Sequence, residues 1–216
     1  MHIAVIDLGI GNLRSVAQAV LAVNDGAEVT VTSDATVVDN ADKIILPGQG
    51  AVGSWFRELN ARQLTQAVNQ ALSERPLLGI CVGMQALFSY CEEDGGLDGL
   101  GVFDGEVRHF QNFLSDAEKQ HVTIPQMGWN QVSQIQSHPL WQGIEDGSNF
   151  YFLHSYCANL SPEADDGVVA GTANYYHEYV AAVARDNVFA TQFHPEKSHD
   201  DGLQLIRNFC HWDGRA

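Results

Sequence analysis

The first half of the chain alternates short apolar runs with helical patterns. Apolar or β-branched runs at 3–6, 28–32 and 43–46 are each followed by Gly, Pro or Asp, which is typical of strands that end in turns. The stretch 12–23 has a helical pattern, and Asn12 is placed to cap its N-terminus. Strands that alternate with helices in this way favour a parallel sheet with helices on both faces. We therefore predict an α/β fold.

Residues 76–88 are the stretch around which the rest is arranged. An apolar strand runs into Gly79-Ile80-Cys81-Val82-Gly83, and helix-forming residues 84–88 follow. A thiol with glycine two positions away on each side has the form of a nucleophile elbow, a sharp strand-to-helix turn where flanking side chains would collide with the backbone. Such a turn sets the thiol at a helix N-terminus, which favours the thiolate. The alternative is a buried cysteine that packs as a small hydrophobe.

Strand-like composition dominates the remainder of the chain. Helical material at 55–72 precedes the elbow, and an acidic, glycine-rich stretch at 91–101 predicts a loop after it. The predicted strands that follow lie at 105–110, 131–135, 150–156, 168–172, 180–184 and 188–193. Asp186-Asn187 predicts a hairpin between the last two, and 200–212 predicts a closing helix with one apolar face. We expect one domain over residues 1–216, with a largely parallel central sheet and additional antiparallel strands in the C-terminal half.

Composition and charge exclude several functional classes. The chain has 216 residues, of which 45% are hydrophobic and 18% charged, as in a globular protein. Its net charge of −16 argues against binding to nucleic acid or an anionic membrane surface. No signal-like segment and no apolar run of transmembrane length occurs. The four cysteines lack the spacing of a metal site or a disulfide framework, so we expect free thiols in a cytoplasmic protein without a metal.

Two glycine-rich turns need interpretation. Gly9-Ile10-Gly11 before a helix resembles a dinucleotide-binding turn, but Arg14 replaces the third glycine, so we reject a nucleotide site. Leu46-Pro47-Gly48-Gln49-Gly50 lacks the Gly-Lys-Ser/Thr of a phosphate loop. Its backbone N–H groups could face a developing oxyanion, or it could be an ordinary Pro-Gly turn. Both interpretations of the second turn stay open at this point.

A nucleophilic thiol needs a base and a group that orients the base. Among the nine histidines His194 stands out, because Pro195 restricts it to extended backbone and Glu196 lies two residues on, where it points the same way. A carboxylate there would hold the imidazole in the tautomer that accepts the thiol proton. His154 could be structural or line a pocket, and His199 lacks the partners of a zinc site.

Three motifs together resemble the class I (triad-type) glutamine amidotransferases: Gly79-Ile-Cys-Val-Gly-Met-Gln85, Pro47-Gly-Gln-Gly50 and Gln192-Phe-His-Pro-Glu-Lys-Ser198. Two further stretches, Pro125-Gln-Met-Gly-Trp-Asn130 and Phe150-Tyr-Phe-Leu-His-Ser-Tyr156, are similar to the glutaminase subunits of imidazole glycerol phosphate synthases, which act in histidine biosynthesis. The match runs in order from the first strand to the last helix. It implies the flavodoxin-like fold of class I amidotransferases.

The resemblance also implies a mechanism that needs no cofactor. Cys81 would attack the side-chain amide of glutamine, His194 would act first as base and then as acid, and Glu196 would orient His194. The backbone N–H groups of Gln49 and Val82 would hold the oxyanion. The residues that would bind glutamine are Gly48, Gly50, Gln85, Glu93, Ser155 and Tyr156.

Three positions depart from the pattern of the family. Gln49, Val82 and Gln126 stand where valine, leucine and histidine are common. The first two would act through backbone N–H groups, so the identity of their side chains matters little. Gln126, by contrast, affects a contact that we expect at the interface with a partner.

The implied partner is the (β/α)8-barrel cyclase subunit of imidazole glycerol phosphate synthase. It would use the ammonia to form imidazole glycerol phosphate and the aminoimidazole carboxamide ribonucleotide, and it would dock over Trp129, Asn130, Tyr151 and Lys197. We expect the Gly-Trp-Asn stretch to be a turn that presents Trp129 at the surface. The alternatives are a paralogous amidotransferase pair, as in sugar amidination, a stand-alone cysteine-dependent γ-glutamyl hydrolase, and a non-catalytic scaffold.

Overall fold

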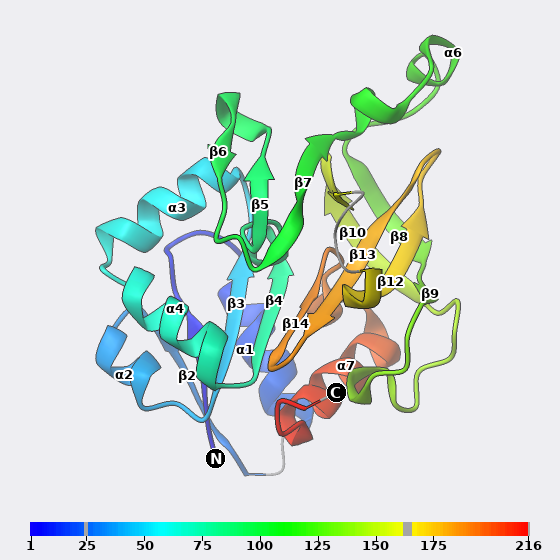
Figure 1. Cartoon of the computed structure of the whole chain (residues 1–216). Helices are drawn as coiled ribbons and strands as arrows, with labels where there is room; N and C mark the ends of the chain where they lie inside the picture. The colour runs from blue at the N-terminus through cyan, green and yellow to red at the C-terminus, as the bar shows by residue number, and fades with distance from the viewer. Residues whose placement is uncertain (24–25, 162–165, 216) are drawn as a thin grey trace.

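The computed structural model describes residues 1–23, 26–161 and 166–215, and a mixed sheet forms its centre (Figure 1). The strands of this sheet are β1 (His2–Ile6), β2 (Glu28–Thr32), β3 (Lys43–Gly48), β4 (Leu77–Cys81), β5 (Phe88–Cys91), β6 (Leu97–Asp98), β7 (Phe103–His109), β9 (Ser133–Gln134), β11 (Tyr156–Leu160), β12 (Val169–Asn174), β13 (Glu178–Arg185) and β14 (Val188–Thr191). Their order is β2-β1-β3-β4-β14-β13-β11-β7-β5-β6, and β12 pairs with both β13 and β9.

The parallel part of the sheet comprises β2, β1, β3, β4 and β14. Strands β3 and β4 are buried along their whole length, because helices cover both faces. Most connections beyond β14 are antiparallel, including β14 to β13 and β11 to β7. The predicted α/β class, with a largely parallel centre and antiparallel strands in the C-terminal half, is confirmed.

The longer helices pack on the parallel strands. They are α1 (Leu13–Val23), α2 (Ala35–Asp39), α3 (Val52–Ala61), α4 (Thr65–Glu74) and α7 (His199–His211). Helices α2, α3 and α4 lie on one side of β3 and β4, and α1 packs against α7 on the other (Figure 1). The predicted cap of α1 is present, since Asn12 Oδ1 accepts the Ser15 N–H at 3.3 Å. No helix of the described residues is long and apolar enough to cross a membrane.

Shorter elements complete the chain. The helical turns are α5 (Val82–Gln85), α6 (Asp116–Lys119), η1 (Glu93–Gly95), η2 (Phe110–Phe113), η3 (Pro139–Trp141), η4 (Asp166–Val168) and η5 (Pro195–Lys197). A second, two-stranded sheet pairs β8 (Gln126–Gln131) with β10 (Asn149–His154). Helix α6 lies at the tip of a projection beyond β7 (Figure 1).

Several predicted elements differ from the observed ones. The helical stretch 55–72 is two helices, α3 and α4, because Gln63 adopts a left-handed conformation with φ +59° between them. The helix predicted at 84–88 ends at Gln85, since the buried Phe88 begins β5 and pairs with Phe103. The loop predicted at 91–101 contains η1 and β6.

The Gly-Trp-Asn stretch is not a turn. It lies inside β8, where Trp129 is paired with Tyr151 of β10. The strand predicted at 131–135 is therefore the end of β8 followed by the short β9. The predicted hairpin at Asp186-Asn187 is confirmed, because Arg185 pairs with Val188 across it.

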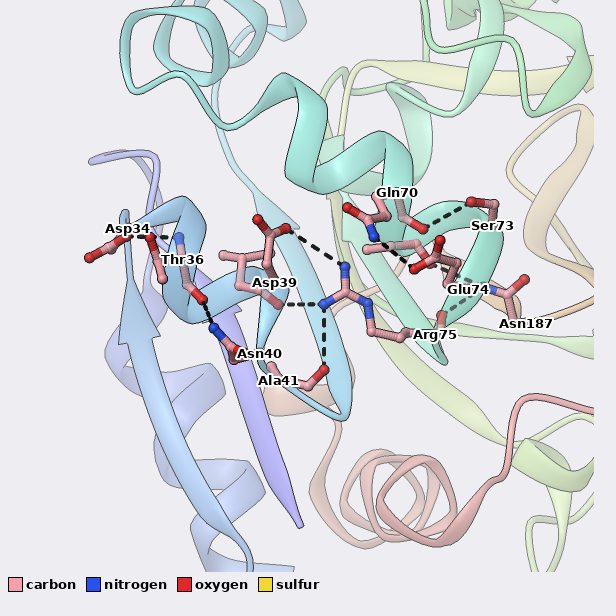
Figure 2. A network of polar contacts seen from close by, with 12 residues as sticks. Asp34, Thr36, Asp39, Asn40, Ala41, Gln70, Ser73, Glu74, Arg75 and Asn187 are labelled. Atoms are coloured by element: carbon pink, nitrogen blue, oxygen red, sulfur yellow. Dashed lines mark hydrogen bonds and ion pairs between the residues drawn. The ribbon is translucent and has the colours of Figure 1, made fainter.

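A polar network holds the start of β4 (Figure 2). Asn187 Nδ2 donates to the carbonyl oxygens of Ala71, Leu72 and Arg75 at the end of α4, at 3.2, 3.1 and 2.6 Å. The Leu77 N–H donates in turn to the Asn187 carbonyl at 2.8 Å. The β13–β14 hairpin and α4 thus fix the strand that ends in Cys81.

Candidate active site

Cys81 occupies a strained turn between β4 and α5. Its backbone has φ +55° and ψ −109°, a conformation that costs energy in a residue with a side chain. A Cβ at Gly83 would overlap the Leu46 carbonyl oxygen, and a Cβ at Gly79 would lie 2.9 Å from the Ala190 Cβ. The Leu46 backbone therefore requires glycine at position 83, and the Ala190 side chain leaves too little room for a Cβ at position 79. The geometry is that of a nucleophile elbow.

His194 and Glu196 form a buried pair beside the thiol. Glu196 Oε1 accepts a hydrogen bond from His194 Nδ1 at 2.9 Å, and each side chain is 2% exposed. Burial alone lowers the pKa of His194, but interactions with Cys81 and Glu196 outweigh it and raise the pKa to about 10. His194 Nε2 has no hydrogen-bond partner within the described ranges. It is therefore placed to exchange a proton with Cys81, and the raised pKa favours that proton on the imidazole.

The backbone around His194 is fixed by hydrogen bonds. The His194 N–H donates to the Tyr151 carbonyl at 2.9 Å, and Ser198 Oγ donates to the His194 carbonyl at 2.6 Å. Ser198 Oγ also accepts the Tyr151 N–H at 3.0 Å. His194 has the extended backbone expected before proline, with φ −100° and ψ 95°. These contacts orient the imidazole before any substrate arrives.

A cavity of about 490 Å³ opens beside Cys81. Of the residues predicted for the site, it is lined by Gln49, Gly50, Cys81, Val82, Gln85, Glu93, Ser155, Tyr156 and His194. Glu196 lies behind His194, and Gly48 lies under the elbow, where an added Cβ would be 2.7 Å from the Val82 Cβ. Residues from five separated stretches of the sequence therefore converge on one cavity.

The far wall of the cavity carries polar groups. Glu93 Oε2 accepts the Val52 N–H at the start of α3 at 2.8 Å, and burial raises the pKa of this carboxyl above its usual value. Gln85 Nε2 donates to the Tyr156 carbonyl at 3.1 Å. The Glu93 carboxylate and the Gln85 amide oxygen are both acceptors, which suits the ammonium and amide groups of an amino acid.

The Pro47–Gly50 corner lies next to the elbow. Gly48 pairs with Cys81 in the β3–β4 register, and Trp55 Nε1 donates to the Pro47 carbonyl at 3.1 Å. Gly50 has φ +79°, which favours glycine. Gln49 and Val82 therefore flank the same end of the cavity as the thiol.

Two further side chains lie at the site: Gln192, which was not predicted, and His154, for which a place in a pocket was one of two expected alternatives. Gln192 is fully buried, and its Nε2 donates to Cys81 Sγ at 3.7 Å. His154 lines the cavity, donates from Nδ1 to the Tyr156 carbonyl at 2.7 Å, and has its pKa lowered to about 4 by burial. Gln192 belongs to the motif that ends in Glu196, but an uncharged residue in a strand-like run gives no signal of its own.

Three of the predicted interface residues gather on one surface. Trp129 is 47% exposed and meets the Tyr151 ring edge-on, with centroids 6.0 Å apart. Lys197 Nζ lies 5.7 Å from the centre of the Tyr151 ring. Asn130 follows Trp129 in β8 and so faces the other way, where its Nδ2 donates to the Asn174 carbonyl at 2.9 Å. The ring of His199, which was not predicted for this surface, stacks on the Trp129 ring with centroids 4.9 Å apart.

Comparison with known proteins places the chain in a family. The model of the class-I glutamine amidotransferase family matches residues 4–212. The imidazole glycerol phosphate synthase subunit HisH of Pseudomonas putida is 48% identical over 213 residues, which are 99% of this chain and 98% of that protein. The HisH subunit of Chromobacterium violaceum is 47% identical over 217 residues, with both chains covered completely.

Solved structures agree on the fold. PurLQS from Thermotoga maritima has a TM-score of 0.70 at 17% identity, with 97% of each chain covered. A further solved glutamine amidotransferase has a TM-score of 0.69 at 16% identity, covering 97% of this chain and 99% of that one. The chain belongs to the class I glutamine amidotransferases and, within them, to the family of the imidazole glycerol phosphate synthase subunit HisH.

Proposed function

We propose that this chain is the glutaminase subunit of an imidazole glycerol phosphate synthase in histidine biosynthesis. It hydrolyses glutamine to glutamate and ammonia and delivers the ammonia to a cyclase subunit. The observation that carries the proposal is the convergence of Cys81 at an elbow with the buried His194–Glu196 pair on one cavity. The identity of the chain to HisH proteins over its whole length supports the same assignment.

The reaction begins when Cys81 Sγ loses its proton to His194 Nε2 and attacks the side-chain amide carbon of glutamine. The carbonyl oxygen becomes an oxyanion, which the N–H groups of Gln49 and Val82 stabilise. His194 then passes its proton to the departing nitrogen, so that ammonia leaves and a glutamyl thioester remains. Glu196 holds the imidazole in position and stabilises its protonated form.

Water completes the cycle. It attacks the thioester carbon while His194 accepts a proton from the water. The bond between that carbon and Cys81 Sγ then breaks, which restores the thiolate and releases glutamate as the second product. The raised pKa of His194 supports this sequence, because the protonated imidazole is stabilised by Cys81 and Glu196 once the proton has moved. The same residue thus acts as base, acid and base again.

The substrate amino acid would lie along the far wall of the cavity. The carboxylate of Glu93 suits an α-ammonium group, and Gln85, whose two N–H donors bond the Tyr156 carbonyl and Gln192 Oε1, offers its own Oε1 as an acceptor to the substrate amide. Backbone groups of Gly48, Gly50, Ser155 and Tyr156 surround the same space or border it. All of them act without a cofactor.

The ammonia would pass to a (β/α)8-barrel cyclase subunit. Trp129, Tyr151 and Lys197 would form the docking surface, with Asn130 beside them, since an exposed aromatic cluster is typical of an interface core. We place the complex in the cytoplasm, because Cys81, Cys91, Cys157 and Cys210 are all free, which suits a reducing compartment.

Cys81→Ala in the complex tests the assignment. Glutamine-dependent synthesis should fall to background, whereas synthesis from added ammonium chloride should continue, because Cys81 serves only to release ammonia. Both rates are measured on the same preparation by product formation. Loss of both activities together, with the fold intact by circular dichroism, would contradict the proposal.

A further inference from the structure

Three amide and carbonyl groups form a continuous hydrogen-bonded chain behind the thiol. The Tyr156 carbonyl accepts from Gln85 Nε2 at 3.1 Å. The same Gln85 Nε2 donates to Gln192 Oε1 at 3.0 Å. Gln192 Nε2 then donates to Cys81 Sγ at 3.7 Å. The chain thus leads from a backbone carbonyl of β11 to the reacting atom at the end of β4.

The direction of this chain is fixed at its far end. A backbone carbonyl can only accept, so Gln85 must turn its NH2 group toward Tyr156. The second hydrogen of that NH2 group can bond only to an acceptor, which makes the neighbouring atom of Gln192 its oxygen. Gln192 is therefore held with its NH2 group toward the sulfur. The reverse orientation would bring two NH2 groups together and set an oxygen against a thiolate.

We propose that Gln192 stabilises the thiolate of Cys81 by donating a hydrogen bond to Sγ, and that Gln85 acts as a positioning residue which fixes that donor. The inference rests on the proposed role of Cys81 as nucleophile. A hydrogen bond from an amide to a charged acceptor is stronger than one to a neutral acceptor, so the contact favours the thiolate over the thiol.

Burial strengthens this effect and separates it from substrate binding. Gln192 is 0% exposed and Gln85 is 4% exposed, so water does not compete for their hydrogen bonds. Gln192 does not line the cavity, whereas Gln85 does. A substitution at Gln192 should consequently change the reactivity of the sulfur without removing a contact to glutamine.

His194 is the titratable side chain next to the sulfur, and Glu196 is hydrogen-bonded to it. His154 interacts electrostatically with His194 from the facing strand β10. These groups remain unchanged in a Gln192 variant, so a difference from the wild-type chain reports the amide itself.

The test measures how fast iodoacetamide alkylates the full chain between pH 5 and 10. Cys81→Ala provides the blank, because it keeps Cys91, Cys157 and Cys210 and lacks only the thiol that lines the cavity. Gln192→Leu removes the donor, and the pH midpoint of alkylation should rise by about one unit or more. Gln192→Glu keeps the shape but turns a carboxylate oxygen to the sulfur, so its midpoint should rise further. In the complex with the synthase, kcat for glutamine hydrolysis should fall at least tenfold with KM within about twofold.

Thr191→Val is the matched control. Thr191 is equally buried, and its Oγ1 donates to the Phe193 carbonyl at 2.9 Å and not to Cys81 Sγ. It should destabilise the same strand end while leaving the alkylation midpoint unchanged. Unchanged midpoints in both Gln192 variants would overturn the inference, as would equal shifts in Thr191→Val. An unreactive Cys81 in the wild-type chain would instead count against the proposed function.

Discussion

Glu196 illustrates how one residue can act only through another. Its Oε1 holds His194 Nδ1 at 2.9 Å, while its Oε2 has no hydrogen-bond partner among the described residues. The carboxylate therefore fixes the orientation of the imidazole and favours its charged form, which leaves Nε2 for the proposed proton transfer. A residue that orients should cost less when altered than the residue that carries the proton.

Glu196→Gln should accordingly reduce glutamine hydrolysis less than His194→Ala. The glutamine amide can still accept from Nδ1, although it no longer stabilises the imidazolium. Initial rates of glutamate release in the complex measure both variants. Complete and equal losses in the two, with both proteins folded, would show that the carboxylate takes a direct part in the chemistry.

Gln49 should matter through its backbone. Gln49 lies between Gly48, where Val82 and Trp55 leave no room for a Cβ, and Gly50, which has φ +79°. Gln49→Val keeps the N–H and should turn over glutamine at nearly the wild-type rate. Gln49→Pro removes the donor and should lower kcat about 10²–10³-fold, because the oxyanion exists mainly in the transition state.

Glutamine binding to Gln49→Pro must be measured as well, since proline also restricts Gly48. Binding within a few-fold of the wild type, together with the slow turnover, assigns the loss to the missing donor. Normal turnover would remove this loop from the oxyanion site.

At the scale of elements, η3 begins with a histidine that caps it. His138 Nδ1 accepts the Leu140 N–H at 3.1 Å, so the ring is neutral, and burial lowers its pKa to about 4. The ring packs against Phe189 and Trp212, which ties η3 to β14 and to the end of α7. Protonation of His138 would break the cap and bury a charge.

This cap should make the folded state sensitive to acid. Above about pH 6.5 the ring is neutral in both states, and its contribution to stability is complete. Between about pH 6.5 and pH 4 the unfolded chain takes up the proton and the folded chain does not. The free energy of unfolding therefore decreases as the pH is lowered through this window. His138→Asn keeps a capping oxygen without titrating, and it should reduce the pH slope of the unfolding free energy by up to one proton.

Urea unfolding at several pH values measures that slope. The absolute stability of His138→Asn will be lower, because the ring contacts are lost, but the slope is the informative quantity. His121→Asn alters an exposed histidine and should leave the slope unchanged. An unchanged slope in His138→Asn would contradict the cap's role.

The parallel half of the fold follows from local signals, and the β8–β10 sheet does not. Apolar runs bounded by glycine and proline identify β1, β3 and β4, because these strands are buried on both faces. Strand β8 contains Gly128 with φ +134° and exposed Met127 and Trp129, so its sequence resembles a turn. Its pairing with β10 is non-local and cannot be seen in a short window.

The site shows the same division. Cys81, His194 and Glu196 could be identified from spacing, since a glycine-flanked thiol and a His-Pro-Glu run each have a physical reason. Phe88 was assigned to a helix because local propensity could not reveal its pairing with Phe103. Gln192 was missed because the value of its amide lies in one contact made across two strands.

On the scale of the molecule, the triad and the aromatic surface share one structural support. The Tyr151 carbonyl accepts the His194 N–H, and the Tyr151 ring contacts both Trp129 and Lys197. A partner bound over these rings would therefore contact β10, the strand whose Tyr151 carbonyl accepts the His194 N–H. Tyr151 therefore connects the exposed aromatic side chains to the backbone of His194.

Trp129→Ala should weaken association with the synthase, or uncouple hydrolysis from synthesis, with little effect on the subunit alone. Truncating a large interface aromatic typically costs about 2 kcal/mol or more in binding. Binding is measured by titration calorimetry and the fold by thermal melting. A large fall in melting temperature of the isolated subunit would mean that Trp129 supports the core instead.

Strand β14 lies between β4 and β13, although it is among the last segments of the chain. Until residues 188–191 exist, β4 is an edge strand and the two halves of the sheet are not joined. During synthesis on the ribosome Cys81 therefore emerges long before His194, and the growing chain carries a thiol without its base. Under the proposed function, we therefore expect glutamine hydrolysis only once β14 has paired with both β4 and β13.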